Sequence, residues 1–137
     1  MVLDTCALIL TGIEGIPDKA ARFTFAMARH AVVDLAQVLN TSPKTGVNRL
    51  SATDFDHLQD VLAASGIRLN PGAATEQKLA EFRKTYEPFV SALATRLLLS
   101  LPPWIPPGDS LDDWQTTASD DLLPSTRQTL IKVMHRE

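Results

Sequence analysis

Residues 18–40, DKAARFTFAMARHAVVDLAQVLN, decide the fold of this 137-residue chain. On a helical wheel of about 100° per residue, the polar side chains share one arc roughly 140° wide, and the opposite half is apolar except for Thr24. A helix with so much apolar surface must be covered by other protein. We therefore predict a long helix at the centre of a helical core. The polar arc contains Arg22, Arg29, His30, Asp34, Gln37 and Asn40.

The same periodicity predicts helices before and after this segment. One is expected over residues 2–11, ended by Gly12, and another over residues 53–64. Thr53 with Asp56 three residues later resembles a capping box. Gly66 followed by an isoleucine fits a Schellman ending, with its hydrophobic contact.

A last long apolar seam runs from about residue 73 towards residue 101. Its apolar side chains are spaced by three or four residues, close to a heptad pattern. Pro88 lies inside the seam, so we expect either a kink or two abutting helices. The run Leu97–Leu99 widens the apolar surface, and we expect the C-terminal half of the seam to be covered on several sides. The seam consists of Leu79, Phe82, Tyr86, Phe89, Leu93 and Leu97.

Together these segments predict an all-α fold, a compact helical bundle of four to five helices with a proline-rich, acidic C-terminal tail. The expected boundaries are a helical domain over residues 1–101, a proline-rich and acidic extended segment over 102–123, and a short C-terminal helix over 124–137. Four prolines between residues 102 and 107 exclude helix there. Five aspartates between residues 109 and 121, with no Lys or Arg among them, make the following stretch acidic.

Composition excludes several classes of function. A net charge of −3 argues against a nucleic-acid partner, which would require a basic face. No run approaches the ~20 apolar residues of a membrane span. The single cysteine, Cys6, lies in an apolar run and is interpreted as a small buried hydrophobe. We find no metal-ligand spacing, no cofactor motif and no catalytic motif, and so expect no enzyme activity.

Two groups of residues are candidate sites. Arg29, His30 and Asp34 lie within about one helical turn and could form a polar sensor, or a polar pair that fixes helix packing. If the chain senses a ligand, a pocket is expected between residues 18–40 and 73–101, near His30 and Asp34. Trp104 and Ile105 could dock in a partner's aromatic groove. Alternatively, Trp104 folds back onto the helical body and pins the tail.

Two strings give a family resemblance. Residues 4–8, DTCAL, and residues 23–35, FTFAMARHAVVDL, resemble the C-terminal cytoplasmic region of bacterial two-transmembrane, potassium-channel-like proteins of the pore-loop ion channel family. A leucine-rich run into PPW, residues 97–104, matches the same pattern. The chain carries no selectivity-filter motif of the TVGYG type and so cannot conduct ions by itself.

The resemblance implies a cytosolic assembly or regulatory domain on the cytoplasmic side of the bacterial inner membrane. Such a domain would act by helix packing, through self-association or against the pore module of a parent protein. The chain opens on what looks like helix interior, so we expect it to be part of a longer protein. The alternative is a free-standing helical module for ligand sensing or protein interaction.

Overall fold

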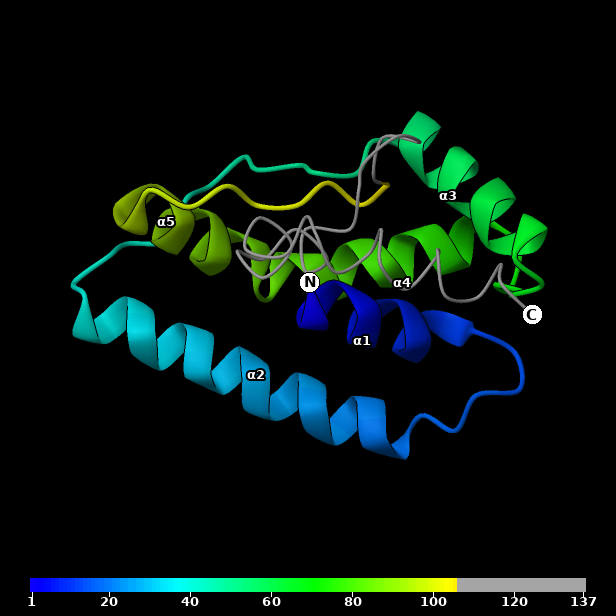
Figure 1. Cartoon of the computed structure of the whole chain (residues 1–137), viewed down its shortest axis with the longest axis horizontal. Helices are drawn as coiled ribbons and strands as arrows, with labels where there is room; N and C mark the ends of the chain where they lie inside the picture. Colours follow the sequence, from blue (N-terminus) through cyan, green and yellow to red (C-terminus); the bar gives the residue numbers. More distant parts are fainter. Residues whose placement is uncertain (106–137) are drawn as a thin grey trace, which may run out of the picture. The chain divides into compact units, whose positions relative to one another are not determined.

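The computed structural model describes residues 1–105, and in this part of the chain it confirms the all-α bundle (Figure 1). The predicted helix over 124–137 and most of the predicted segment over 102–123 lie outside the described residues. The five helices are α1 (Val2–Gly12), α2 (Lys19–Val38), α3 (Ala52–Ala64), α4 (Ala73–Lys84) and α5 (Glu87–Leu97).

Helix α1 is the central element of the bundle. It packs against both α2 and α4, and Figure 1 shows it lying between them. Its apolar residues Leu3, Cys6, Ala7 and Leu10 follow an i, i+3, i+4, i+7 pattern, and all four are buried. The burial of Cys6 matches the interpretation from sequence, and burial raises the pKa of its thiol.

Helix α2 is not the centre of the core, contrary to the prediction. Only Ala21, Phe25 and Ala36 are buried in it, while Phe23 and Val38 are 70% and 80% exposed. A helical wheel shows how much of a helix is apolar, but not whether the chain has enough neighbours to cover it. Here α1 and α5 cover one face of α2, and its second apolar face points outwards.

The cap of α3 lies two residues earlier than the sequence pattern suggested. Ser51, not Thr53, is the N-cap, and its hydroxyl accepts a 3.2 Å hydrogen bond from the Asp54 backbone N–H. The Asp54 carboxylate in turn accepts from the Ser51 backbone, which completes the capping box. The Schellman ending is confirmed, because the backbone N–H of Ile67 donates to the Leu62 carbonyl at 2.9 Å.

The seam over residues 73–101 forms two abutting helices, one of the two alternatives expected from Pro88. Pro88 lies in the first turn of α5, where its missing N–H leaves no helical acceptor unpaired. Two edge-to-face contacts tie this junction to α2: the Phe25 ring is centred 5.3 Å from Phe82 and 5.8 Å from Tyr86. The phenol of Tyr86 is fully buried as a result.

None of the helices in residues 1–105 combines the length and the hydrophobicity that a membrane crossing requires. In the C-terminal half of the seam, the five consecutive residues 90–94 are all buried, so the expectation that this half is covered on several sides is confirmed there. The leucine run that follows is exposed. The reason is local: the chain leaves the helix at Leu98, which adopts a left-handed conformation with φ 56° and is 93% exposed.

Replacing Leu98 by glycine should therefore stabilise the protein. A non-glycine residue in the left-handed region costs about 1–2 kcal/mol, and an exposed Leu98 side chain loses little packing when removed. We expect Leu98→Gly to raise the free energy of unfolding, measured in urea, by about 1 kcal/mol. The matched control, Leu97→Gly, replaces the last residue of α5, which has no positive φ, and should lower it. A loss of stability in Leu98→Gly would contradict this account.

Candidate functional site

A cluster of four charged side chains, which we call the ion cluster, lies where α1, α4, α5 and the 48–50 segment meet. Asp4 comes from α1, Arg83 from the last turn of α4, and Glu87 from the start of α5. Arg49 enters from the segment before α3. Arg83 and Glu87 lie four residues apart, on the two sides of the break between α4 and α5, and both are buried, Glu87 being only 3% exposed.

Glu87 and Asp4 hold the two guanidinium groups. One oxygen of Glu87 accepts from Arg83 Nε at 3.0 Å and lies 3.1 Å from Arg49 Nη2, and the other accepts from Arg83 Nη2 at 3.1 Å. Arg49 Nη2 also donates to Asp4 Oδ1 at 2.6 Å, and the hydroxyl of Tyr86 donates to the same oxygen at 2.7 Å. The two positive and two negative charges neutralise one another.

The arginines also bind the backbone of neighbouring segments. Arg83 donates to the carbonyl of Leu50 at 3.1 Å and to the side-chain oxygen of Asn48 at 2.8 Å. Arg49 donates to the carbonyl of Pro102 at 3.1 Å. The cluster thereby fixes two irregular segments, residues 48–50 and residues 102–105, against the helices.

Trp104 covers the cluster. Its ring centre lies 5.9 Å from the guanidinium carbon of Arg49 and 5.7 Å from that of Arg83, which is cation–π geometry. Its indole N–H approaches Glu87 at 3.4 Å, and Ile105 packs beside it on the core. Trp104 therefore folds back onto the helical body, the alternative that the sequence left open beside partner docking.

Burial and charge shift the pKa of Arg49 in the ion cluster and the pKa of Tyr86, which donates to it. Burial alone lowers the pKa of Arg49, but the hydrogen bond and the charge of Asp4, together with Glu87, outweigh it and raise that pKa. Burial raises the pKa of Tyr86 far above its ordinary value of 10.0, and the hydrogen bond to the Asp4 carboxylate adds to the shift.

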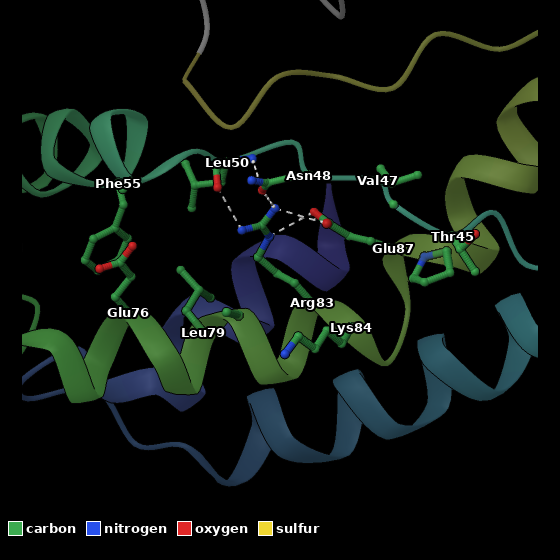
Figure 2. A pocket seen from close by; sticks show the side chains of 14 residues that line it. Thr45, Val47, Asn48, Leu50, Phe55, Glu76, Leu79, Arg83, Lys84 and Glu87 are labelled. Carbon is green, nitrogen blue, oxygen red and sulfur yellow. Dashed lines mark hydrogen bonds and ion pairs between the residues drawn. The ribbon is translucent and has the colours of Figure 1, made fainter.

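A groove of about 650 Å³ borders the cluster. Figure 2 shows Arg83 reaching from α4 towards Glu87, Asn48 and Leu50, with Phe55 and Leu79 farther along the same groove. Its lining comes from residues 45–52, α3, α4 and the start of α5, and none of it from α2. This groove is not the pocket that the ligand-sensing alternative places between residues 18–40 and 73–101, near His30 and Asp34. Where α2 meets the junction of α4 and α5, the rings of Phe25, Phe82 and Tyr86 pack together.

The three polar residues singled out on α2 lie on the surface. His30 Nε2 lies 3.2 Å from Asp34 Oδ2, and both side chains are more than half exposed. Arg29 is exposed as well, and its Nε donates to the carbonyl of Thr85 at 3.1 Å, which ties α2 to the end of α4. The structure brings these residues together as a surface pair and a tether, and not around a pocket.

Sequence reasoning missed the ion cluster. One available signal was Asp4, a lone carboxylate on the apolar face of a helix. Another was the pair of Arg83 and Glu87, which lie four residues apart just before Pro88. Arg49 had no signal, because it lies in an irregular segment whose position depends on tertiary packing. The ion cluster joins five segments of the chain through ion pairs and hydrogen bonds. Among residues 1–105, no group of three His, Cys, Asp or Glu side chains is placed to hold a metal ion.

Comparison of the chain with family models, with curated proteins and with solved structures finds no match in any of the three.

Removing the charge of Glu87 should destabilise the fold strongly. Glu87→Gln keeps the side-chain shape but leaves two arginines facing one carboxylate in a buried site, which costs about 3 kcal/mol in the free energy of unfolding. Urea denaturation followed by circular dichroism measures this. The control Glu81→Gln, at an exposed position on α4, should change stability by less than about 0.5 kcal/mol. Equal effects in the two variants would show that the cluster does not hold the fold.

The hydrogen bond from Tyr86 to the ion cluster should make the stability of the fold depend on pH in the alkaline range. A raised pKa in the folded state means that the hydrogen-bonded phenol contributes its full stability below pH 10.0, the ordinary value, and loses it progressively above. Because Tyr86 is the single tyrosine of the chain, tyrosinate absorbance reports it alone. We expect no tyrosinate in the folded protein at pH values where free tyrosine ionises, and its appearance only together with unfolding. Titration of the folded protein near pH 10 would contradict the burial of the phenol.

Proposed function

We propose that this chain is an assembly or regulatory domain that acts by packing helices against other protein and not by catalysis. In this proposal it belongs to the cytosolic side of a bacterial inner-membrane, potassium-channel-like protein. Support comes from where the resembling strings lie: residues 4–8 fall on α1 and residues 23–35 on α2, and these two helices pack against each other. The residues of these two strings therefore lie on neighbouring, packed helices.

The observation that carries the proposal is the outward apolar face of α2. We call it the α2 outer stripe. Its residues follow one another at intervals of four, four, four and three, so they share one side of the helix. Apolar surface gathered in this way on an exposed helix is typical of a contact with protein. The stripe consists of Phe23, Met27, Ala31, Leu35 and Val38, all exposed.

The same helix offers a route by which docking could act on the rest of the domain. On its inner face, Phe25 contacts the rings of Phe82 and Tyr86. Tyr86 in turn donates to Asp4 in the ion cluster, and the cluster holds Trp104. A displacement of α2 by a partner would therefore reach the 102–105 segment through packed side chains, which is how a regulatory signal travels.

The groove beside Arg83 supports a second candidate, a ligand-sensing module. Its volume of about 650 Å³ falls in the range of small-molecule sites, and Leu50, Phe55 and Leu79 give it an apolar lining. A small apolar ligand would suit it. Ala80→Phe, which fills the groove, should abolish binding of such a ligand and leave the α2 outer stripe unchanged.

Introducing a charge into the α2 outer stripe should weaken self-association. Met27 is 56% exposed, so Met27→Glu leaves the core intact. In a symmetric dimer each copy loses about 1.5 kcal/mol of apolar burial, and the total of about 3 kcal/mol corresponds to a roughly hundredfold rise in Kd. Sedimentation velocity over a series of protein concentrations measures the shift.

Val61→Glu is the matched control, because Val61 is an exposed apolar residue on a different helix, α3. We expect this variant to associate like the unchanged chain. If the unchanged chain stays monomeric at every concentration, the self-association form of the proposal fails. If both variants weaken association equally, the contact does not depend on α2.

A further inference from the structure

We infer that the α2 outer stripe binds the same stripe of a second copy of this chain, antiparallel, about a two-fold axis at Ala31. The inference rests on the proposed assembly function and identifies its partner and its geometry. It follows from three properties of the stripe: the order of its side-chain sizes, the charges along its edge, and the extent of its surface.

The side chains of the stripe are nearly symmetric in size about Ala31. Met27 precedes it by four residues and Leu35 follows it by four, while Phe23 and Val38 occupy the two ends. In an antiparallel pair centred on residue 31, Met27 of one copy faces Leu35 of the other, and Ala31 faces itself. A surface with this internal symmetry is self-complementary, which is what a two-fold contact requires.

A small residue at the centre allows the two helices to approach closely. Helix axes pack 8–10 Å apart depending on the side chains at the contact, and alanine at the crossing permits about the lower value. The edge of the stripe that faces the core is small and uncharged as well, since it carries Ala20, Thr24 and Ala28. No long polar side chain on that edge holds a second helix away.

Charge favours the antiparallel direction over the parallel one. His30 and Asp34 lie along the other edge of the stripe, one turn apart, with Nε2 and Oδ2 at 3.2 Å. A two-fold axis at Ala31 places the His30 of each copy next to the Asp34 of the other. A parallel pair would instead place the His30–Asp34 edge of one copy beside the small, uncharged edge of the other, so these pairs between copies would be lost. The pair of His30 and Asp34 therefore favours an antiparallel orientation of the two α2 helices.

The extent of the surface predicts a weak dimer. α2 has 20 residues and is about 30 Å long, so a single pair of such helices buries less than the roughly 1,200 Å² at which stable interfaces begin. We therefore expect a dimer that forms and dissociates with protein concentration, as suits a regulatory contact or one link in a larger assembly.

Disulfide trapping in the full 137-residue chain tests the geometry. Three variants each place one cysteine on the stripe: Ala31→Cys, Met27→Cys and Leu35→Cys. Val61→Cys on α3 measures random collision, and the buried Cys6 stays in place because its thiol is inaccessible. Oxidised glutathione is the oxidant, dimers are separated without reductant, and circular dichroism confirms that each variant is folded.

The antiparallel pair predicts one pattern. Ala31→Cys should form a disulfide with itself at least about tenfold faster than Val61→Cys, because the two-fold axis holds the two residues within the Cα separation that a disulfide needs. Met27→Cys should not link to itself above the collision rate, but it should link to Leu35→Cys in an equal mixture, with the joined peptides identified by mass spectrometry.

Two other patterns would overturn the inference and leave the proposed function standing. Rapid self-linking of Met27→Cys shows a parallel pair. A concentration-dependent dimer in which Ala31→Cys links no faster than Val61→Cys shows an interface elsewhere on the chain. Sedimentation of the unchanged chain as a monomer at every concentration would instead remove self-association itself, and with it the inference.

Discussion

The neutralisation of Glu87 is the constraint on which the described structure depends. A carboxylate that is 3% exposed must be paired, because an isolated buried charge costs several kcal/mol. Its partners, Arg83 and Arg49, are held by acceptors from α1, the 48–50 segment and the 102 carbonyl. Each of these segments must therefore take its place before the charges are balanced, so one electrostatic requirement fixes the positions of elements far apart in the sequence.

Helix α2 stands outside this requirement. It contributes no charge to the ion cluster and is attached by Phe25, by the small residues that face α1, and by the hydrogen bond from Arg29 to Thr85. Apolar packing on the inner face is enough to hold the helix. No contact within the described domain requires the residues on its outer face to be polar. The outer apolar face of α2 thus stays exposed, while the mostly polar helix α4 contributes Arg83 to the centre of the charge network.

The sequence predicted what depends on periodicity and local chemistry. The helical class, the break near Pro88 and the ending at Gly66 each follow from residues within one or two turns. It misjudged what depends on the rest of the chain: which helix is central, and which of two neighbouring Ser/Thr–Asp pairs forms the cap of α3. Arg49 could not have been found, because its role is set by contacts with Asp4 and Pro102, about 45 and 53 residues away.

The two arginines of the ion cluster differ in how completely their N–H groups are hydrogen-bonded. Arg83 uses its Nε and both Nη groups in hydrogen bonds. Arg49 has a buried Nε with no acceptor among the described residues, a shortfall of about 1–3 kcal/mol. Arg49 is also the residue that binds the carbonyl of Pro102. Tyr86 and Arg49 also share one oxygen of Asp4, so Tyr86 is linked through Asp4 and Arg49 to the carbonyl of Pro102.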